Sequence, residues 1–137
     1  MGVRGTGDGP QVRSCRVKSP HEAARILQEE IERLIDHGGL HPENISILSP
    51  MEYPDSAAAL LPSGLSARIQ VLDEYSMRHF PPASISFAKI AHFKGLENEA
   101  VILIDLPEPL NGTHPITDHY VGMSRARALL SLIFISR

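Results

Sequence analysis

The spacing of apolar residues predicts one long amphipathic helix near the start of the chain. Four apolar side chains recur at helical intervals: Ala23, Leu27, Ile31 and Leu34. The run Ser19-Pro20-His21-Glu22 has a capping serine, a proline at the first helical position and a glutamate three residues after the serine, which is typical of a helix N-terminus. Gly38-Gly39 then ends the helix. A single apolar stripe predicts that this helix, from 19 to 37, lies with one face on a sheet.

Short apolar runs predict the strands of that sheet, at residues 11–17, 45–48, 68–72, 85–90, 101–104 and 129–135. Val101 to Ile104 is apolar without a break, as expected of a strand that is covered on both faces. Between the strands we expect a helical turn at 57–61, a loop with three prolines at 105–115, and a helix from Thr117 to about Ala128. This alternation predicts an α/β fold in which helices layer a sheet.

Composition and charge place the chain among soluble globular proteins. Its 137 residues suit one domain, at 11–137, preceded by a glycine-rich tail or linker at 1–10. Cys15 is the only cysteine, which excludes an internal disulfide and favours a reducing, cytoplasmic setting. No apolar run is long enough to cross a membrane, so no membrane partner is expected. The net charge of -3 argues against a broad surface that coats nucleic acid, but it allows a narrow track of phosphate contacts.

Two stretches have residues suited to nucleotide chemistry. In Phe93-Lys94-Gly95-Leu96-Glu97, the glycine allows backbone amides to approach a ligand closely, and the carboxylate can accept hydrogen bonds from ribose hydroxyls. In Tyr120-Val121-Gly122-Met123-Ser124-Arg125-Ala126-Arg127, two arginines have the rigid fork that suits phosphate. Taken alone, the first stretch also fits a solvated turn, and the two arginines also fit solvent-facing side chains or ion pairs to nearby acids.

Together, the two stretches resemble motifs V and VI of UvrD/Rep-type superfamily 1 helicases. Ile45-Ser46-Ile47-Leu48-Ser49-Pro50 resembles the strand of motif IV, so the resemblance runs from about Ile45 to Ile135. The chain departs from the family in having Pro50 where motif IV often ends in arginine. It also has Ala91 where a histidine usually precedes motif V, and His92 stands one residue late.

The resemblance implies the C-terminal, or second, RecA-like domain of such a helicase: a three-layer sandwich with a mostly parallel sheet and helices on both faces. It implies that Glu97 contacts the ATP ribose, that Gly95 belongs to the nucleotide site, and that Arg125 is the catalytic arginine finger on the γ-phosphate. Such a finger accelerates phosphoryl transfer by about 10³–10⁵-fold. It also implies that Lys94 lies near the track of single-stranded DNA.

A P-loop, GxxxxGK[ST], is the element that this family needs to hold ATP and Mg²⁺, and no Gly-Lys pair exists in this sequence. Ile69 to Glu74 faintly resembles a Walker B strand, but its place between motifs IV and V favours a strand followed by a polar turn. We therefore expect half of a composite site. ATP and Mg²⁺ would be held by an N-terminal RecA-like P-loop domain of the same protein, and single-stranded DNA would be the other partner.

Two other functions remain open from the sequence. The chain could be a degenerate RecA-like module that binds protein or nucleic acid without hydrolysing ATP, or another doubly wound phosphate-binding domain such as a receiver. No metal site is expected, because Gly38-Gly39 separates His37 from His41, and the loop group His114, Asp118 and His119 has no evident further ligand.

Overall fold

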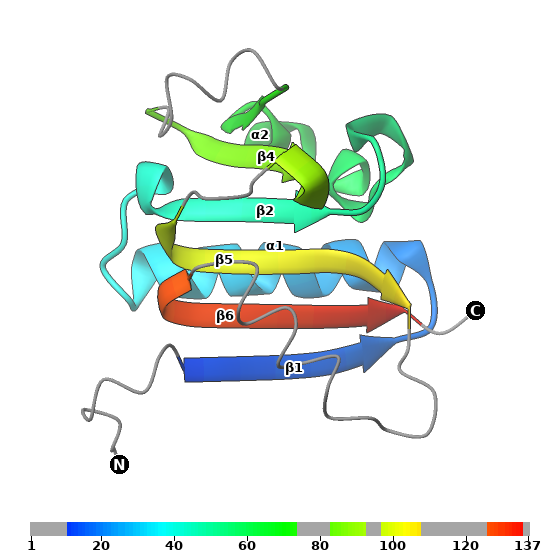
Figure 1. Cartoon of the computed structure of the whole chain (residues 1–137), viewed down its shortest axis with the longest axis horizontal. Coiled ribbons are helices and arrows are strands. Elements are labelled where there is room, and N and C mark those ends of the chain that lie inside the picture. Colours follow the sequence, from blue (N-terminus) through cyan, green and yellow to red (C-terminus); the bar gives the residue numbers. More distant parts are fainter. Residues whose placement is uncertain (1–10, 74–82, 93–96, 108–125, 136–137) are drawn as a thin grey trace.

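A six-stranded, fully parallel sheet forms the centre of the molecule (Figure 1). The computed structural model describes residues 11–73, 83–92, 97–107 and 126–135. The strands lie in the order β1-β6-β5-β2-β4-β3. Their bounds are β1 Gln11–Val17, β2 Ile45–Ser49, β3 Ile69–Val71, β4 Ile85–Lys89, β5 Asn98–Pro107 and β6 Ala126–Ile135. The α/β class and the parallel sheet of a RecA-like sandwich, both expected from the sequence, are confirmed.

Helix α1, Pro20–Asp36, begins and ends where its sequence signals place it. The Ser19 hydroxyl accepts a hydrogen bond of 3.1 Å from the backbone N–H of Glu22, which satisfies one of the unpaired donors of the first turn. After the helix, Gly39 adopts a φ of +72°, a left-handed conformation that side chains disfavour. None of the described helices is long and apolar enough to cross a bilayer.

The apolar side chains sort into two clusters, one on each face of the sheet. The α1 face gathers Leu27 and Ile31 of the helix against Ile47, Phe87 and Ile102 of the strands. It also receives side chains from three shorter helices: η3 Tyr53–Asp55, η4 Ala57–Leu60 and α2 Ser63–Ser66. The opposite face gathers Val101 and Leu103 of β5 with Leu130 and Leu132 of β6, and Ile90 of the short helix η6, Ile90–His92, packs against them. Val101 to Ile104 are fully buried, so the prediction of a strand covered on both faces is confirmed.

Three predicted boundaries near β5 and β6 are wrong, and the first is the start of β5, which lies at Asn98 rather than at Val101. β5 continues to Pro107, through residues 105–107 that we expected in a loop. β6 begins at Ala126, so residues 126–128 are extended, although we expected a helix to continue to about Ala128. Both extensions are paired: Pro107 aligns with Ile135, and Ala126 aligns with Asn98. Pairing with a neighbouring strand therefore makes these residues extended, and the local pattern of apolar and polar residues does not reveal that pairing. The rest of the expected helix from Thr117 lies outside the described residues.

The β5–β6 pair contains two register shifts of opposite sense. Between the pairs Asn98–Ala126 and Ala100–Leu129, β5 advances two residues while β6 advances three, so the extra residue is in β6. Between Leu103–Leu132 and Leu106–Phe134, β5 advances three residues while β6 advances two, so the extra residue is in β5. The second bulge restores the register that the first one shifts. Bulges commonly re-aim side chains next to functional sites.

Candidate functional site

The amino edge of the sheet brings together the described ends of the two helicase-like stretches, Glu97 from the first and Ala126-Arg127 from the second (Figure 1). β5 and β6 are adjacent parallel strands, and both begin at this edge. Asn98, the residue after Glu97, is the register partner of Ala126, the residue after Arg125. The first residues of the two strands, which are distant in the chain, therefore lie side by side.

Asn98 anchors the start of β5 through a buried polar network. Its carboxamide donates to the Glu43 carbonyl at 3.1 Å and to the Ser46 hydroxyl at 2.9 Å, and its oxygen accepts from the backbone N–H of Glu99 at 2.8 Å. The Ser46 hydroxyl lies 2.8 Å from that of Ser86, which extends the network from β5 across β2 to β4. Buried polar groups are costly unless they are hydrogen-bonded, so this network fixes the position of the strand end.

Glu97, the predicted ribose contact, is exposed at this edge and belongs to a three-residue ion-pair cluster. Arg127 Nη1 donates to Glu97 Oε1 at 3.3 Å, and Arg127 Nε lies 3.0 Å from Glu99 Oε1. The three side chains are 53%, 43% and 36% exposed, in the order Arg127, Glu97 and Glu99. The Glu97 carboxylate is therefore partly exposed at the surface of the domain.

The bulge in β6 accounts for the direction of Arg127. Arg127 and Ala128 are both exposed between the buried residues Ala126 and Leu129. A regular strand would turn successive side chains to opposite faces, whereas here the extra residue leaves two neighbours at the surface. Of the sequence-based alternatives for Arg127, an ion pair to nearby acids is the one observed. The run Glu97-Asn98-Glu99 opposite an arginine pair was the available signal, but strand register was needed to connect them.

The other predicted site residues lie outside the described residues. These are Lys94 and Gly95, which precede Glu97, and Arg125, which precedes Ala126. Their assigned roles stay predictions. For Glu97, burial in the interior would have excluded a ribose contact, and its exposure at the sheet edge is compatible with one.

The carboxyl edge of the sheet has a buried carboxylate that the sequence did not indicate. Asp105 is 7% exposed and has a φ of +60°, and it lies in the β5 bulge. It accepts a hydrogen bond of 2.7 Å from the Ser49 hydroxyl at the end of β2, and its two oxygens lie 3.2 and 3.3 Å from the backbone N–H of Ala57. These bonds tie β5 to β2 and to the start of η4.

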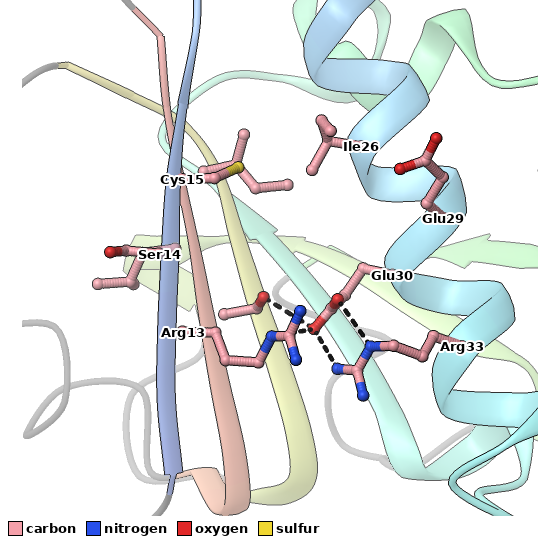
Figure 2. Close-up of a pocket in the computed structure, with 10 residues that line it drawn as sticks. Arg13, Ser14, Cys15, Ile26, Glu29, Glu30 and Arg33 are labelled. Atoms are coloured by element: carbon pink, nitrogen blue, oxygen red, sulfur yellow. Dashed lines mark hydrogen bonds and ion pairs between the residues drawn. The ribbon is translucent and has the colours of Figure 1, made fainter.

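A cavity of about 260 Å³ lies between α1 and the β1–β6 edge (Figure 2). Its polar wall is Glu30, a buried carboxylate that accepts from Arg33 at 2.9 and 3.3 Å and from the Ser131 hydroxyl at 3.0 Å. Arg13 approaches the same carboxylate to 3.6 Å. Cys15 lines the cavity, and burial, followed by the nearby Glu30, raises the pKa of its thiol. Through Glu30, helix α1 is joined to Ser131 of β6 and to Arg13 of β1.

Comparison with known proteins gives a structural likeness. No protein-family model matches the chain, and no curated protein sequence matches it. Among solved structures, the chain is similar to the C-terminal domain of a possible DNA helicase from Lactobacillus plantarum WCFS1, with a TM-score of 0.57 and 16% sequence identity. The match covers 97% of this chain and 78% of that one. At this identity the likeness shows a shared fold and nothing more specific.

Proposed function

We propose that this chain is the second motor domain of an ATP-dependent DNA helicase or translocase of the UvrD/Rep type. In this proposal it acts with an N-terminal RecA-like P-loop domain of the same protein, which holds ATP and Mg²⁺. The chain supplies the arginine finger, Arg125, and the ribose contact, Glu97. It is not a complete ATPase, because the sequence has no Gly-Lys pair from which a P-loop could be built.

The observation that carries the proposal is the pairing of Asn98 with Ala126. A composite nucleotide site requires the carboxylate of one stretch and the guanidinium of the other to lie on one rim, facing a nucleotide held by another domain. The register places their chain neighbours beside each other at the amino edge of the sheet, and Glu97 is exposed there. The shared fold with the helicase C-terminal domain described above supports the same proposal.

The proposed site works by charge placement. Negative charge on the transferring phosphoryl group is stabilised when the Arg125 guanidinium is brought to it, which lowers the barrier to hydrolysis. The same contact depends on the γ-phosphate, so the cleft closes around ATP and opens after hydrolysis. Glu97 accepts hydrogen bonds from the ribose and aligns the nucleotide with the rim. In this proposal Lys94 lies between the nucleotide site and single-stranded DNA. Each cycle of cleft closure and opening then moves the DNA by one step.

The decisive experiment uses the complete polypeptide that contains this chain. Arg125→Ala should lower kcat for DNA-stimulated ATP hydrolysis by about 10³–10⁵-fold while leaving the affinity for ATP nearly unchanged, because the finger acts in the transition state. The matched control is Arg25→Ala, which removes an exposed arginine that pairs with Glu22 and Glu29 on α1, away from the site. Phosphate release gives kcat, and titration of a fluorescent ATP analogue gives affinity.

Two outcomes would overturn the proposal. One is an Arg125→Ala protein with the same kcat as Arg25→Ala. The other is a complete polypeptide that hydrolyses no ATP in the presence of single-stranded DNA, which would favour the binding module without ATPase activity.

A further inference from the structure

The ion-pair cluster at the amino edge consists of Arg127, Glu97 and Glu99, and stabilising the fold is not its main effect. Arg127 lies between Glu97 and Glu99, with its Nη1 on one carboxylate and its Nε on the other, at 3.3 and 3.0 Å. All three side chains are at least one-third exposed, and exposed ion pairs contribute little to folding. Their main physical consequence is therefore on the orientation of the side chains that they join.

Two of the three residues in the cluster belong to strands. Glu99 is inside β5, and its N–H donates to the buried carboxamide of Asn98. Arg127 is in the β6 bulge, which directs it outward beside the start of β5. Glu97 precedes β5 and is the one member of the cluster outside a strand. The rigid guanidinium fork can therefore transmit the position of Glu99 to the Glu97 carboxylate.

We propose that Arg127 is a positioning residue, which holds the Glu97 carboxylate in place to receive the ribose hydroxyls of ATP. The inference rests on the proposed function, and it extends that function by making Arg127 and Glu99 determinants of the preference for ribose over deoxyribose nucleotides. A carboxylate has two oxygens and about four acceptor positions, so an ion pair at Oε1 is compatible with hydrogen bonds from a sugar.

The proposal predicts a particular kinetic signature. A hydrogen bond to a charged group is worth about tenfold or more in discrimination against an analogue that lacks the hydroxyl. Loss of orientation should therefore weaken nucleotide binding and reduce that discrimination. The defect should appear chiefly in KM, since Arg127 acts through Glu97 on the sugar and the phosphate chemistry is assigned to Arg125.

The test compares ATP with 2′-deoxy-ATP and 3′-deoxy-ATP as substrates of the complete polypeptide. The unmodified protein should prefer ATP to at least one of the deoxy analogues by about tenfold in kcat/KM. Glu97→Gln and Arg127→Ala should each lose most of that preference, and the double variant should lose no more than either single one, because both act on one contact. Arg127→Lys should fall between Arg127→Ala and the unmodified protein, because one ammonium cannot join two carboxylates as the fork does.

Arg25→Ala is the matched control, since Arg25 also joins two glutamates on an exposed surface, at 3.1 and 3.9 Å. It should keep the preference for ATP and have a melting temperature close to that of Arg127→Ala. If Glu97→Gln loses the preference but Arg127→Ala keeps it, the positioning role is overturned and the proposed function stands. If Glu97→Gln keeps the preference, the ribose contact itself is overturned, and the positioning role falls with it.

Discussion

Asp105 illustrates how one residue can be held in an unfavourable backbone conformation by its surroundings. A φ of +60° is uncommon outside glycine, although aspartate tolerates it better than most residues. Here the conformation supplies the extra residue of the β5 bulge, and the buried carboxylate accepts from Ser49 and from the N–H of Ala57. The hydrogen bonds offset the cost of the left-handed backbone.

Replacement of Asp105 should separate these two contributions. Asp105→Ala removes the acceptor and places a less tolerant residue at positive φ, so the free energy of unfolding should fall by about 2–4 kcal/mol. Asp105→Asn keeps a side-chain oxygen and a residue that tolerates this conformation, so it should lose less than half as much. Urea denaturation followed by circular dichroism measures both, and equal losses in the two variants would contradict this account.

The thiol of Cys15 should react slowly in the folded protein. Burial and the nearby Glu30 raise its pKa, so a smaller fraction is thiolate at any pH below that value. The rate of alkylation by iodoacetamide should therefore rise at higher pH in the folded chain than in the urea-unfolded chain. Mass spectrometry of the adduct over a pH series measures both profiles. Superimposable profiles would show that the fold leaves the ionisation of this thiol unchanged.

At the scale of elements, α1 depends on both its cap and its buried face. The cap is the Ser19 hydroxyl, which accepts from the Glu22 N–H, and the buried face includes Leu27 and Ile31, both fully buried. Glu30 adds a polar clamp to the sheet through Ser131. Tertiary contacts therefore reinforce a helix that local signals already start and end.

Removal of the cap should have a measurable effect on stability without changing the fold. Ser19→Ala should lower the free energy of unfolding by about 1 kcal/mol, because a backbone donor of the first turn loses its acceptor. Ser63→Ala, at an exposed serine that begins the short α2, is the matched control and should change it by less than about 0.5 kcal/mol. Urea titrations of the two variants give the comparison. A Ser19→Ala protein as stable as the control would show that the Ser19 cap does not stabilise α1.

At the scale of the whole molecule, the sheet places Glu97 and Arg127 at one edge, where both side chains are exposed. A rim of this kind suits a site that is completed by another domain. The proposed function therefore predicts that this chain alone hydrolyses no ATP above background, with or without single-stranded DNA, since it lacks a P-loop.

Phosphate release by the purified 137-residue chain tests this expectation. Glu97→Gln serves as a control for contaminating ATPases, because turnover by a contaminant would be the same in both preparations. Turnover that the unmodified chain shows and Glu97→Gln lacks would contradict the half-site account and place a complete nucleotide site in this chain.

The sequence by itself determined the features that depend on neighbouring residues. The cap and apolar stripe of α1, the two glycines after it, and the buried run from Val101 to Ile104 all follow from local chemistry and periodicity. The strands at 11–17, 45–49, 69–71 and 85–89 were predicted to within one residue at every end, whereas the role of Glu97 stays a prediction.

Only the tertiary structure decided the features that depend on which strands become neighbours. The pairing of β5 with β6 extends both strands beyond their apolar runs, creates the two bulges, and brings Arg127 to Glu97 and Glu99. The contacts of β5 with β2 give buried partners to Asn98 and Asp105, and the contact of α1 with β6 gives one to Glu30, although the sequence alone would place all three among solvated residues. Hydrogen bonds across a parallel sheet join residues that are distant in the chain, so no local pattern of apolar and polar positions contains them.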